Sequence, residues 1–173
     1  MPTKTLMSPE EFLSLPDKPG KQELVEGELI EVPPAKLTHM RIIKNLQELL
    51  RTVLPKSRVW AETGYQLGRR TWLQPDVSVS WPDQKVENDW MQGAPMIAVE
   101  VISPANRPED IEKKIAAYLE HGAAEVWVIY PDTPSMVVFR KESWERVTQS
   151  YHAKMIGLTI DLRRLLADCA ASA

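Results

Sequence analysis

The apolar positions along the chain change between helical and extended spacing, and this pattern predicts most of the secondary structure. From Thr38 to Pro55 the apolar residues recur every three or four positions, which is typical of a helix with one buried face. Thr38 is suited to cap the start of this helix and Pro55 to end it. A shorter helix is predicted to begin after Ser8, and another covers residues 109–121 and stops at Gly122.

Extended segments are predicted where β-branched and aromatic residues gather between turn residues. Residues 23–32 read as a β-hairpin that turns at Glu26-Gly27. Residues 82–95 are polar, contain Pro82, Gly93 and Pro95, and read as a loop. The remaining predicted strands are 59–63, 65–67, 71–81, 97–102, 126–130, 136–139 and 144–148, followed by a terminal strand and helix within 158–167.

The order of these elements predicts an α/β (mixed α+β) fold with a central mixed sheet flanked by helices and an N-terminal β-hairpin. Residues 97–130 form a strand–helix–strand unit, which implies a right-handed crossover and a parallel strand pair. The hairpins on either side add antiparallel pairs. The length of 173 residues and the absence of a linker predict one domain over residues 1–173.

Composition and charge describe an ordinary globular protein. The chain is 43% hydrophobic and 26% charged, and its net charge of -3 argues against a broad electrostatic grip on nucleic acid, although a local basic groove is compatible with it. Cys169 is the one cysteine, so no intrachain disulfide can form. No apolar run approaches the ~20 residues of a membrane span. A cytoplasmic location is expected.

Two acids within predicted strands, Asp76 and Glu100, are the strongest chemical signal. A carboxylate in an apolar strand is costly to bury unless a partner or a cation compensates it. Two such acids on neighbouring strands favour a shared Mg²⁺ or Mn²⁺ ion. The structural alternatives are an Asx turn at Asp76 after Pro75, and a strand-end carboxylate at Glu100 that pairs with backbone donors or an arginine.

The helix over residues 109–121 offers a lysine next to these acids. Its buried face contains Ile111, Ile115 and Tyr118, and at about 100° per residue Lys114 lies on the flank of that face. Lys113 is predicted to point to solvent on the opposite side. An ordinary surface lysine is the alternative for Lys114.

Three more residues are candidates for accessory roles. With a two-residue turn, Glu23 and Glu28 point to the same face of the hairpin, so either could add a third carboxylate; a solvated hairpin is the alternative. His39, at the start of the long helix, could contact a phosphate or a water, or could simply be a polar residue at a helix end.

The order strand-Asp, strand-Glu, helix-Lys resembles the PD-(D/E)XK nuclease superfamily, and most closely its restriction-endonuclease-like Uma-two family. In that superfamily the lysine usually follows the glutamate by two residues; here that position is Ile102, and the resembling branch moves the lysine to the next helix. The resemblance is carried by residues 22–29, Pro34, His39, 74–77, 99–104, Lys114, Tyr118, Gly122, 125–128 and 157–162.

The resemblance implies a Mg²⁺-dependent endonuclease that hydrolyses DNA, with Asp76 and Glu100 as metal ligands and Lys114 as the third catalytic residue. A homodimer is expected, since enzymes that cut both strands often act in pairs. Two alternatives remain open from the residues. One is a non-catalytic module that binds nucleic acid or protein on the nuclease fold, and the other is a metal-dependent hydrolase of small phosphorylated molecules.

Overall fold

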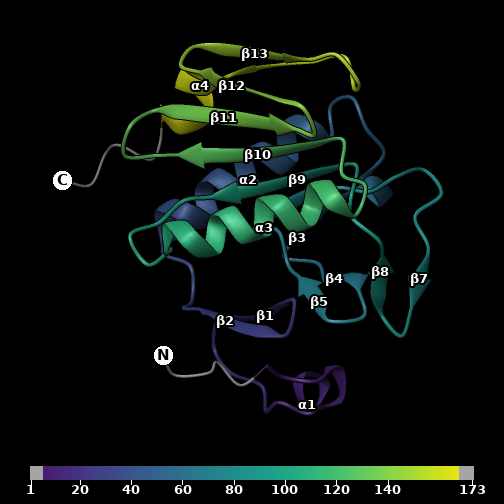
Figure 1. Cartoon of the computed structure of the whole chain (residues 1–173). Helices are drawn as coiled ribbons and strands as arrows, with labels where there is room; N and C mark the ends of the chain where they lie inside the picture. The colour runs from purple at the N-terminus through teal and green to yellow at the C-terminus, as the bar shows by residue number, and fades with distance from the viewer. Residues whose placement is uncertain (1–5, 168–173) are drawn as a thin grey trace.

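This computed structural model describes residues 6–167 of the chain (Figure 1). The strands in these residues form two six-stranded mixed sheets and a separate strand pair. The first, here called the hairpin sheet, runs in the order β2 (Glu28–Val32), β1 (Lys21–Val25), β5 (Thr71–Leu73), β4 (Tyr65–Gly68), β8 (Trp90–Gln92) and β7 (Val86–Glu87). The second, the central sheet, runs β12 (Ser143–Val147), β11 (Ser135–Arg140), β10 (Glu125–Tyr130), β9 (Ile97–Val101), β6 (Val77–Val79) and β3 (Val59–Ala61). The separate pair is β13 (Ser150–Ala153) with β14 (Leu158–Asp161).

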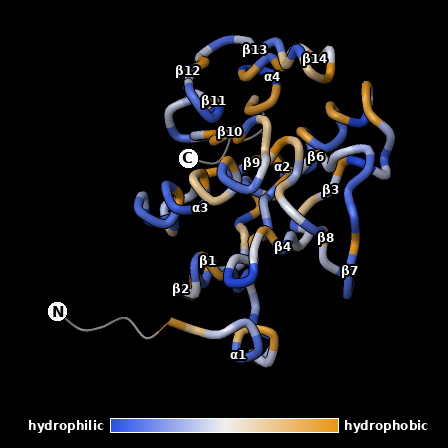
Figure 2. The backbone as a smooth tube through the Cα atoms, turned by 45° about the vertical axis from the view of Figure 1, so that its right-hand side comes forward, coloured by the Kyte–Doolittle hydropathy of each residue, from blue (hydrophilic) through white to orange (hydrophobic). Residues whose placement is uncertain are grey.

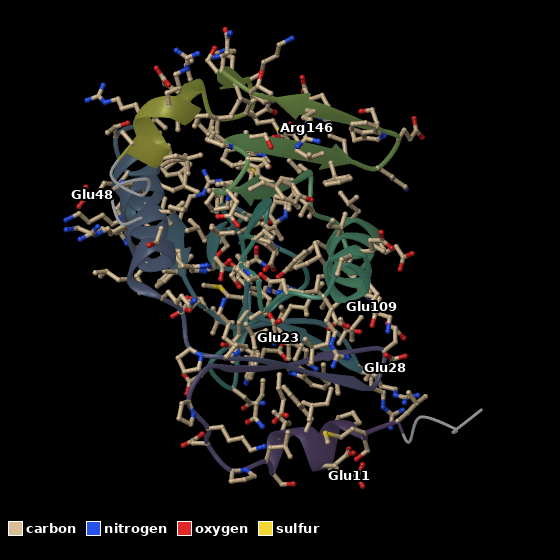
Figure 3. The ribbon with its side chains drawn as sticks, turned by 90° about the vertical axis from the view of Figure 1, so that its left-hand side faces the viewer. Glu11, Glu23, Glu28, Glu48, Glu109 and Arg146 are labelled. Atoms are coloured by element: carbon tan, nitrogen blue, oxygen red, sulfur yellow. The ribbon has the colours of Figure 1, made fainter. Side chains whose placement is uncertain are left out.

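Helices cover the central sheet from both sides. They are α2 (Leu37–Leu50) and α4 (Leu162–Leu166) on one face and α3 (Pro108–Glu120) on the other. The short helix α1 (Pro9–Leu13) packs instead on the hairpin sheet, where Phe12 meets Trp72, and the 3₁₀ turn η1 (Lys56–Arg58) leads into β3. Val99 of β9 packs with α2, whereas Ala98 packs with α3, because neighbouring residues of a strand face opposite sides. Figure 3 shows α2 and α3 on either side of the strands, and Figure 2 shows long hydrophobic stretches in β9 and β10. The mixed α+β class predicted from the pattern is confirmed.

The predicted crossover and both predicted hairpins are present. Strands β9 and β10 pair in parallel through α3, and β11 pairs antiparallel with β12. Strands β1 and β2 pair in the expected register, with Val25 opposite Glu28. Glu26 and Gly27 at their turn have φ values of 50° and 86°, which is the left-handed backbone that a tight hairpin turn needs.

The segment 71–81 was predicted as one strand, but it divides between the two sheets. Strand β5 ends at Leu73 in the hairpin sheet, and β6 starts at Val77 in the central sheet. Pro75 lies between them and has no N–H to donate to a strand ladder, which explains the break. The single central sheet expected from the sequence is therefore two sheets, and the chain crosses from one to the other next to Asp76.

Two further boundaries differ from the prediction. Residues 82–95 contain the hairpin β7–β8, because Asn88 and Asp89 take φ values of 50° and 64° and form a tight turn. Helix α2 begins at Leu37 rather than after a Thr38 cap, and it ends at Leu50. Residues 51–54 follow as turns before Pro55, so the apolar stripe continues past the end of the helix.

A buried charge cluster on β10 shows how this fold neutralises an acid without a metal. Glu125 is 6% exposed and accepts hydrogen bonds from Arg140 Nε at 2.9 Å, Tyr151 Oη at 2.7 Å and Trp127 Nε1 at 2.7 Å. An arginine and two neutral donors thus satisfy both carboxylate oxygens. Glu125 is a structural carboxylate.

We expect Arg140→Met to destabilise the protein by about 1–3 kcal/mol, because it leaves the buried Glu125 carboxylate without its cation. Urea denaturation followed by tryptophan fluorescence measures this loss. Lys141→Met, a neighbouring exposed lysine, is the matched control and should leave the free energy of unfolding nearly unchanged. Equal stability of the two variants would contradict the structural role of the Arg140–Glu125 pair.

Candidate active site

Asp76 and Glu100 lie on the same face of the central sheet. Strands β6 and β9 pair antiparallel with Val77 opposite Val99 and Ser78 opposite Ala98, so one more step sets Asp76 opposite Glu100. Both residues are 4% exposed. The Asp76 Oδ2 atom also accepts a 2.7 Å hydrogen bond from the backbone N–H of Val101. The strand register therefore brings together the two acids singled out from the sequence.

Helix α3 places Lys114 directly against Glu100. The Lys114 Nζ atom lies 2.8 Å from both carboxylate oxygens of Glu100, and the side chain is 4% exposed. Tyr118, one helical turn later, donates a 3.0 Å hydrogen bond to Glu100 Oε1. Residues four apart share a helix face, so α3 holds the glutamate with two donors from one side.

Glu23 joins this cluster from β1, whereas Glu28 does not. Glu23 is fully buried, its Oε1 atom accepts a 2.7 Å hydrogen bond from Gln74 N–H, and its Oε2 atom lies 2.9 Å from Lys114 Nζ. That second contact is an ion pair without hydrogen-bond geometry. Figure 3 shows Glu23 between the hairpin and α3, with Glu28 farther along the hairpin.

Glu28 pairs instead with Lys113 at 2.5 Å. The prediction that Lys113 points freely to solvent is therefore wrong. The two glutamates share a face of the hairpin as expected, and α3 crosses that face, so the adjacent lysines of α3 each meet one glutamate. The Lys113–Glu28 pair is partly exposed, at 36% and 28% of the two side chains, and ties the helix to the edge of the hairpin.

Two side chains contact the Asp76 carboxylate, and a third residue, Glu62, contacts one of them. Lys21 Nζ lies 2.5 Å from Asp76 Oδ1 and donates to the Gln74 carbonyl at 3.1 Å, and His39 Nε2 lies 3.2 Å from the same Oδ1 atom. Glu62, at the end of β3, lies 3.7 Å from Lys21 Nζ. Its φ of 49° is a backbone conformation that residues other than glycine rarely adopt.

Lys21 and Glu62 were missed by the sequence reasoning. Lys21 precedes Glu23 by two positions on β1, so strand alternation alone puts both on one face, and this signal was available. Glu62 follows Ala61, which stands opposite Val77, so its place beside Asp76 depends on a strand register that the sequence does not reveal.

Burial and neighbouring charges separate the pKa values of the two strand acids. Burial raises the pKa of Glu100 to about 7, helped by repulsion from Asp76 and Glu23 and opposed by Lys114. Burial acts in the same direction on Asp76, but Lys21 and His39 outweigh it and hold the pKa of Asp76 below its ordinary value. For Lys114, attraction by Glu100 and Glu23 overcomes burial and raises its pKa. The protein therefore compensates the negative charge of Glu100 less completely than that of Asp76.

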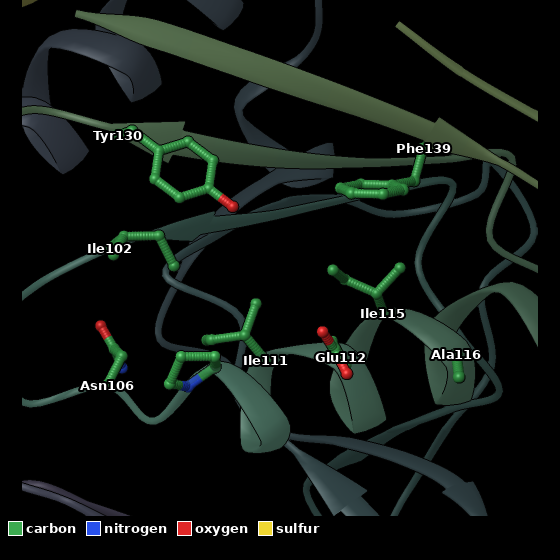
Figure 4. Close-up of a pocket in the computed structure, with 9 residues that line it drawn as sticks. Ile102, Asn106, Ile111, Glu112, Ile115, Ala116, Tyr130 and Phe139 are labelled. Atoms are coloured by element: carbon green, nitrogen blue, oxygen red, sulfur yellow. The ribbon is translucent and has the colours of Figure 1, made fainter. Parts of the chain in front are cut away.

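A groove opens onto this cluster. Its volume is about 910 Å³, and residues 32–36, 38–40 and 100–106 line it together with Lys21, Asp76 and Lys114. A smaller hollow of about 390 Å³ adjoins it between α3 and β10–β11 (Figure 4). Apolar side chains such as Ile111, Ile115 and Phe139 dominate that hollow, whereas the acids line the groove.

The donor set of the cluster fits a hard divalent cation completed by water or substrate. Among residues 6–167, no group of three or more His, Cys, Asp or Glu side chains is placed to hold a metal ion, so the protein supplies at most two such ligands at one point. Mg²⁺ seldom uses a closed cage of protein ligands; it binds one or two carboxylates and keeps waters or phosphate oxygens as its other ligands. Asp76 and Glu100 supply two carboxylates at a groove, and together with Glu23 they share the two ammonium groups of Lys21 and Lys114, which leaves an excess of negative charge.

Comparison with known proteins places the fold of this chain in the nuclease-like class. A solved structure described as "a putative nuclease belonging to DUF820 from Anabaena variabilis ATCC 29413" matches with a TM-score of 0.83 and 23% sequence identity, over 94% of this chain and 99% of that one. The profile of the Uma2 family, described as "Putative restriction endonuclease", matches residues 9–166, so the chain belongs to this family. None of the curated proteins matches the chain. No helix within residues 6–167 is long and apolar enough to cross a membrane.

The raised pKa of Glu100 predicts a pH-dependent stability. A carboxyl whose pKa rises from 4.5 to about 7 on folding contributes stability that is fully present below pH 4.5 and is lost as pH rises through 7. We therefore expect the wild type to lose free energy of unfolding relative to Glu100→Gln, which cannot ionise, between pH 5 and pH 8. Urea titrations at several pH values without divalent cations measure this difference. A difference that stays constant across that range would show that Glu100 titrates normally.

Proposed function

We propose that the protein is a Mg²⁺- or Mn²⁺-dependent endonuclease that hydrolyses phosphodiester bonds in DNA. The observation that carries the proposal is that Asp76, Glu100 and Lys114, which come from two strands and a helix, meet in one groove. Membership of a restriction endonuclease family supports nucleic acid as the substrate class. The same cluster supplies both anionic ligands and a buried ammonium, which are the groups that phosphodiester hydrolysis requires.

Asp76 and Glu100 are the residues that would hold the divalent cation. Once bound, such an ion polarises a phosphoryl oxygen and lowers the pKa of a water molecule. The protein keeps the two ligands in position: Val101 N–H fixes Asp76, and Tyr118 fixes Glu100. Ligands held by fixed donors need little rearrangement when the cation arrives.

Lys114 has the position of an electrostatic catalyst. Its ammonium is buried between Glu100 and Glu23, so its charge acts through a poorly screened environment and is worth more there than in water. Glu23 orients it from the hairpin side. We propose that Lys114 stabilises the negative charge that develops on the phosphoryl group, while His39 orients Asp76.

A nicking assay on supercoiled plasmid tests the proposed function. We expect Mg²⁺ or Mn²⁺ to support conversion to open-circular DNA, EDTA to abolish it, and Glu100→Gln to remove it. Glu112→Gln, an exposed acid on α3, is the matched control and should retain activity. Absence of metal-dependent nicking in the wild type would favour the non-catalytic binding module.

Lys114 should be separable from Lys113 in the same assay. We expect Lys114→Ala to reduce cleavage by about 10²-fold or more, as loss of one preorganised electrostatic contact commonly does. Plasmid binding should change much less, because the contribution is made in the transition state. Lys113→Ala removes the same charge from the same helix and breaks only the partly exposed pair with Glu28, so it should stay active with a slightly lower melting temperature. Equal activity of the two variants would remove Lys114 from the mechanism.

A homodimer remains part of the proposal, because cutting both strands of a duplex requires two active sites or two successive reactions. Analytical ultracentrifugation with and without a short duplex measures the assembly state directly.

A further inference from the structure

Lys21 contacts the Asp76 carboxylate at the position where a metal ion would bind. Its ammonium lies 2.5 Å from Asp76 Oδ1, and the Lys21 side chain is 9% exposed. The other carboxylate oxygen of Asp76 is taken by the N–H of Val101. Both oxygens of Asp76 are therefore engaged by protein donors.

A divalent cation on Asp76 Oδ1 would compete with the Lys21 ammonium, which already contacts that oxygen together with His39. Mg²⁺ ligands lie ~2.1 Å from the ion, so an ion on Oδ1 and the Lys21 ammonium on the same oxygen would be like charges in a weakly screened site. The N–H of Val101 belongs to the backbone of β9 and cannot leave. Lys21 is on a flexible four-carbon stem and can move.

The groove offers Lys21 a second partner. Glu62 lies 3.7 Å from its ammonium and has a side chain that is 38% exposed, so an ammonium that leaves Asp76 can stay paired at the wall of the groove. His39, which also contacts Asp76 Oδ1, carries no obligatory charge and can remain beside a metal-bound carboxylate.

We propose that Lys21 is a resident cation that holds Asp76 in the metal-free protein and gives up this position when a divalent cation binds. The inference rests on the proposed metal-dependent function. In the metal-free state Lys21 limits the repulsion between Asp76 and Glu100, which the strand register holds on one face. The same contact opposes metal binding, so the site has a lower affinity for divalent cations than its carboxylates alone provide.

Mn²⁺ titration followed by electron paramagnetic resonance, which reports the free ion, tests this competition. We expect Lys21→Met and Lys21→Gln to bind Mn²⁺ about tenfold or more tightly than the wild type, because each removes a competing positive charge in contact with the ligand. Lys21→Gln keeps a hydrogen-bond donor for Asp76, so it covers the case in which Lys21→Met fails to fold. Lys21→Arg keeps the charge and should bind no more tightly than the wild type.

Lys18→Met is the matched control for net charge. Lys18 is exposed, pairs with Glu31 and lies outside the groove, so its loss should leave Mn²⁺ affinity close to that of the wild type. An equal gain in this control would overturn the inference, since the effect would then follow from net charge alone. Unchanged or weaker Mn²⁺ binding in both neutral Lys21 variants would also overturn it, while leaving the proposed function intact. Absence of Mn²⁺ binding in the wild type and in every Lys21 variant would instead contradict the metal site itself.

Discussion

The structure depends on balancing three buried carboxylates with two buried ammonium groups. Glu23, Asp76 and Glu100 face Lys21 and Lys114 where the two sheets and α3 meet. Buried charges are tolerated only when paired and hydrogen-bonded, so each member of the cluster requires the others to be in place. The cluster thereby joins β1 of the hairpin sheet, β6 and β9 of the central sheet, and α3.

This balance also connects the fold to its proposed chemistry. Away from the groove, Arg140 balances the charge of Glu125, and two neutral donors complete its hydrogen bonds. The Glu125 carboxylate is therefore fully engaged by protein groups. The groove cluster differs because Glu100 keeps a raised pKa and because three carboxylates there share two ammonium groups. Both features indicate negative charge that the protein does not fully compensate, and an added cation can supply the balance.

Much of this arrangement could be predicted from local patterns. The sequence pointed to Asp76 and Glu100 as a pair on neighbouring strands, and the register of β6 against β9 puts them opposite one another. The helical spacing of α3 was enough to bring Lys114 towards them. Two-residue turn geometry correctly put Glu23 and Glu28 together on one face of the hairpin. The assignment of roles to these residues remains a prediction.

The features that the sequence did not predict depend on contacts between segments that are distant in the chain. The break at Pro75 separates two sheets because β5 pairs with β1 and β6 pairs with β9, and a single strand pattern does not contain that choice of partners. Lys113 was assigned to solvent from its helix face alone, yet the hairpin covers that side and supplies Glu28. Glu62 reaches Lys21 only through the register of β3 against β6.

The most direct test of the account is anomalous diffraction from crystals soaked in Mn²⁺. We expect one strong anomalous peak within coordinating distance of both the Asp76 and Glu100 carboxylates, with Lys21 moved away from Asp76. A peak bound elsewhere, or no peak in crystals that retain an open groove, would contradict the assignment of these two acids as the metal ligands.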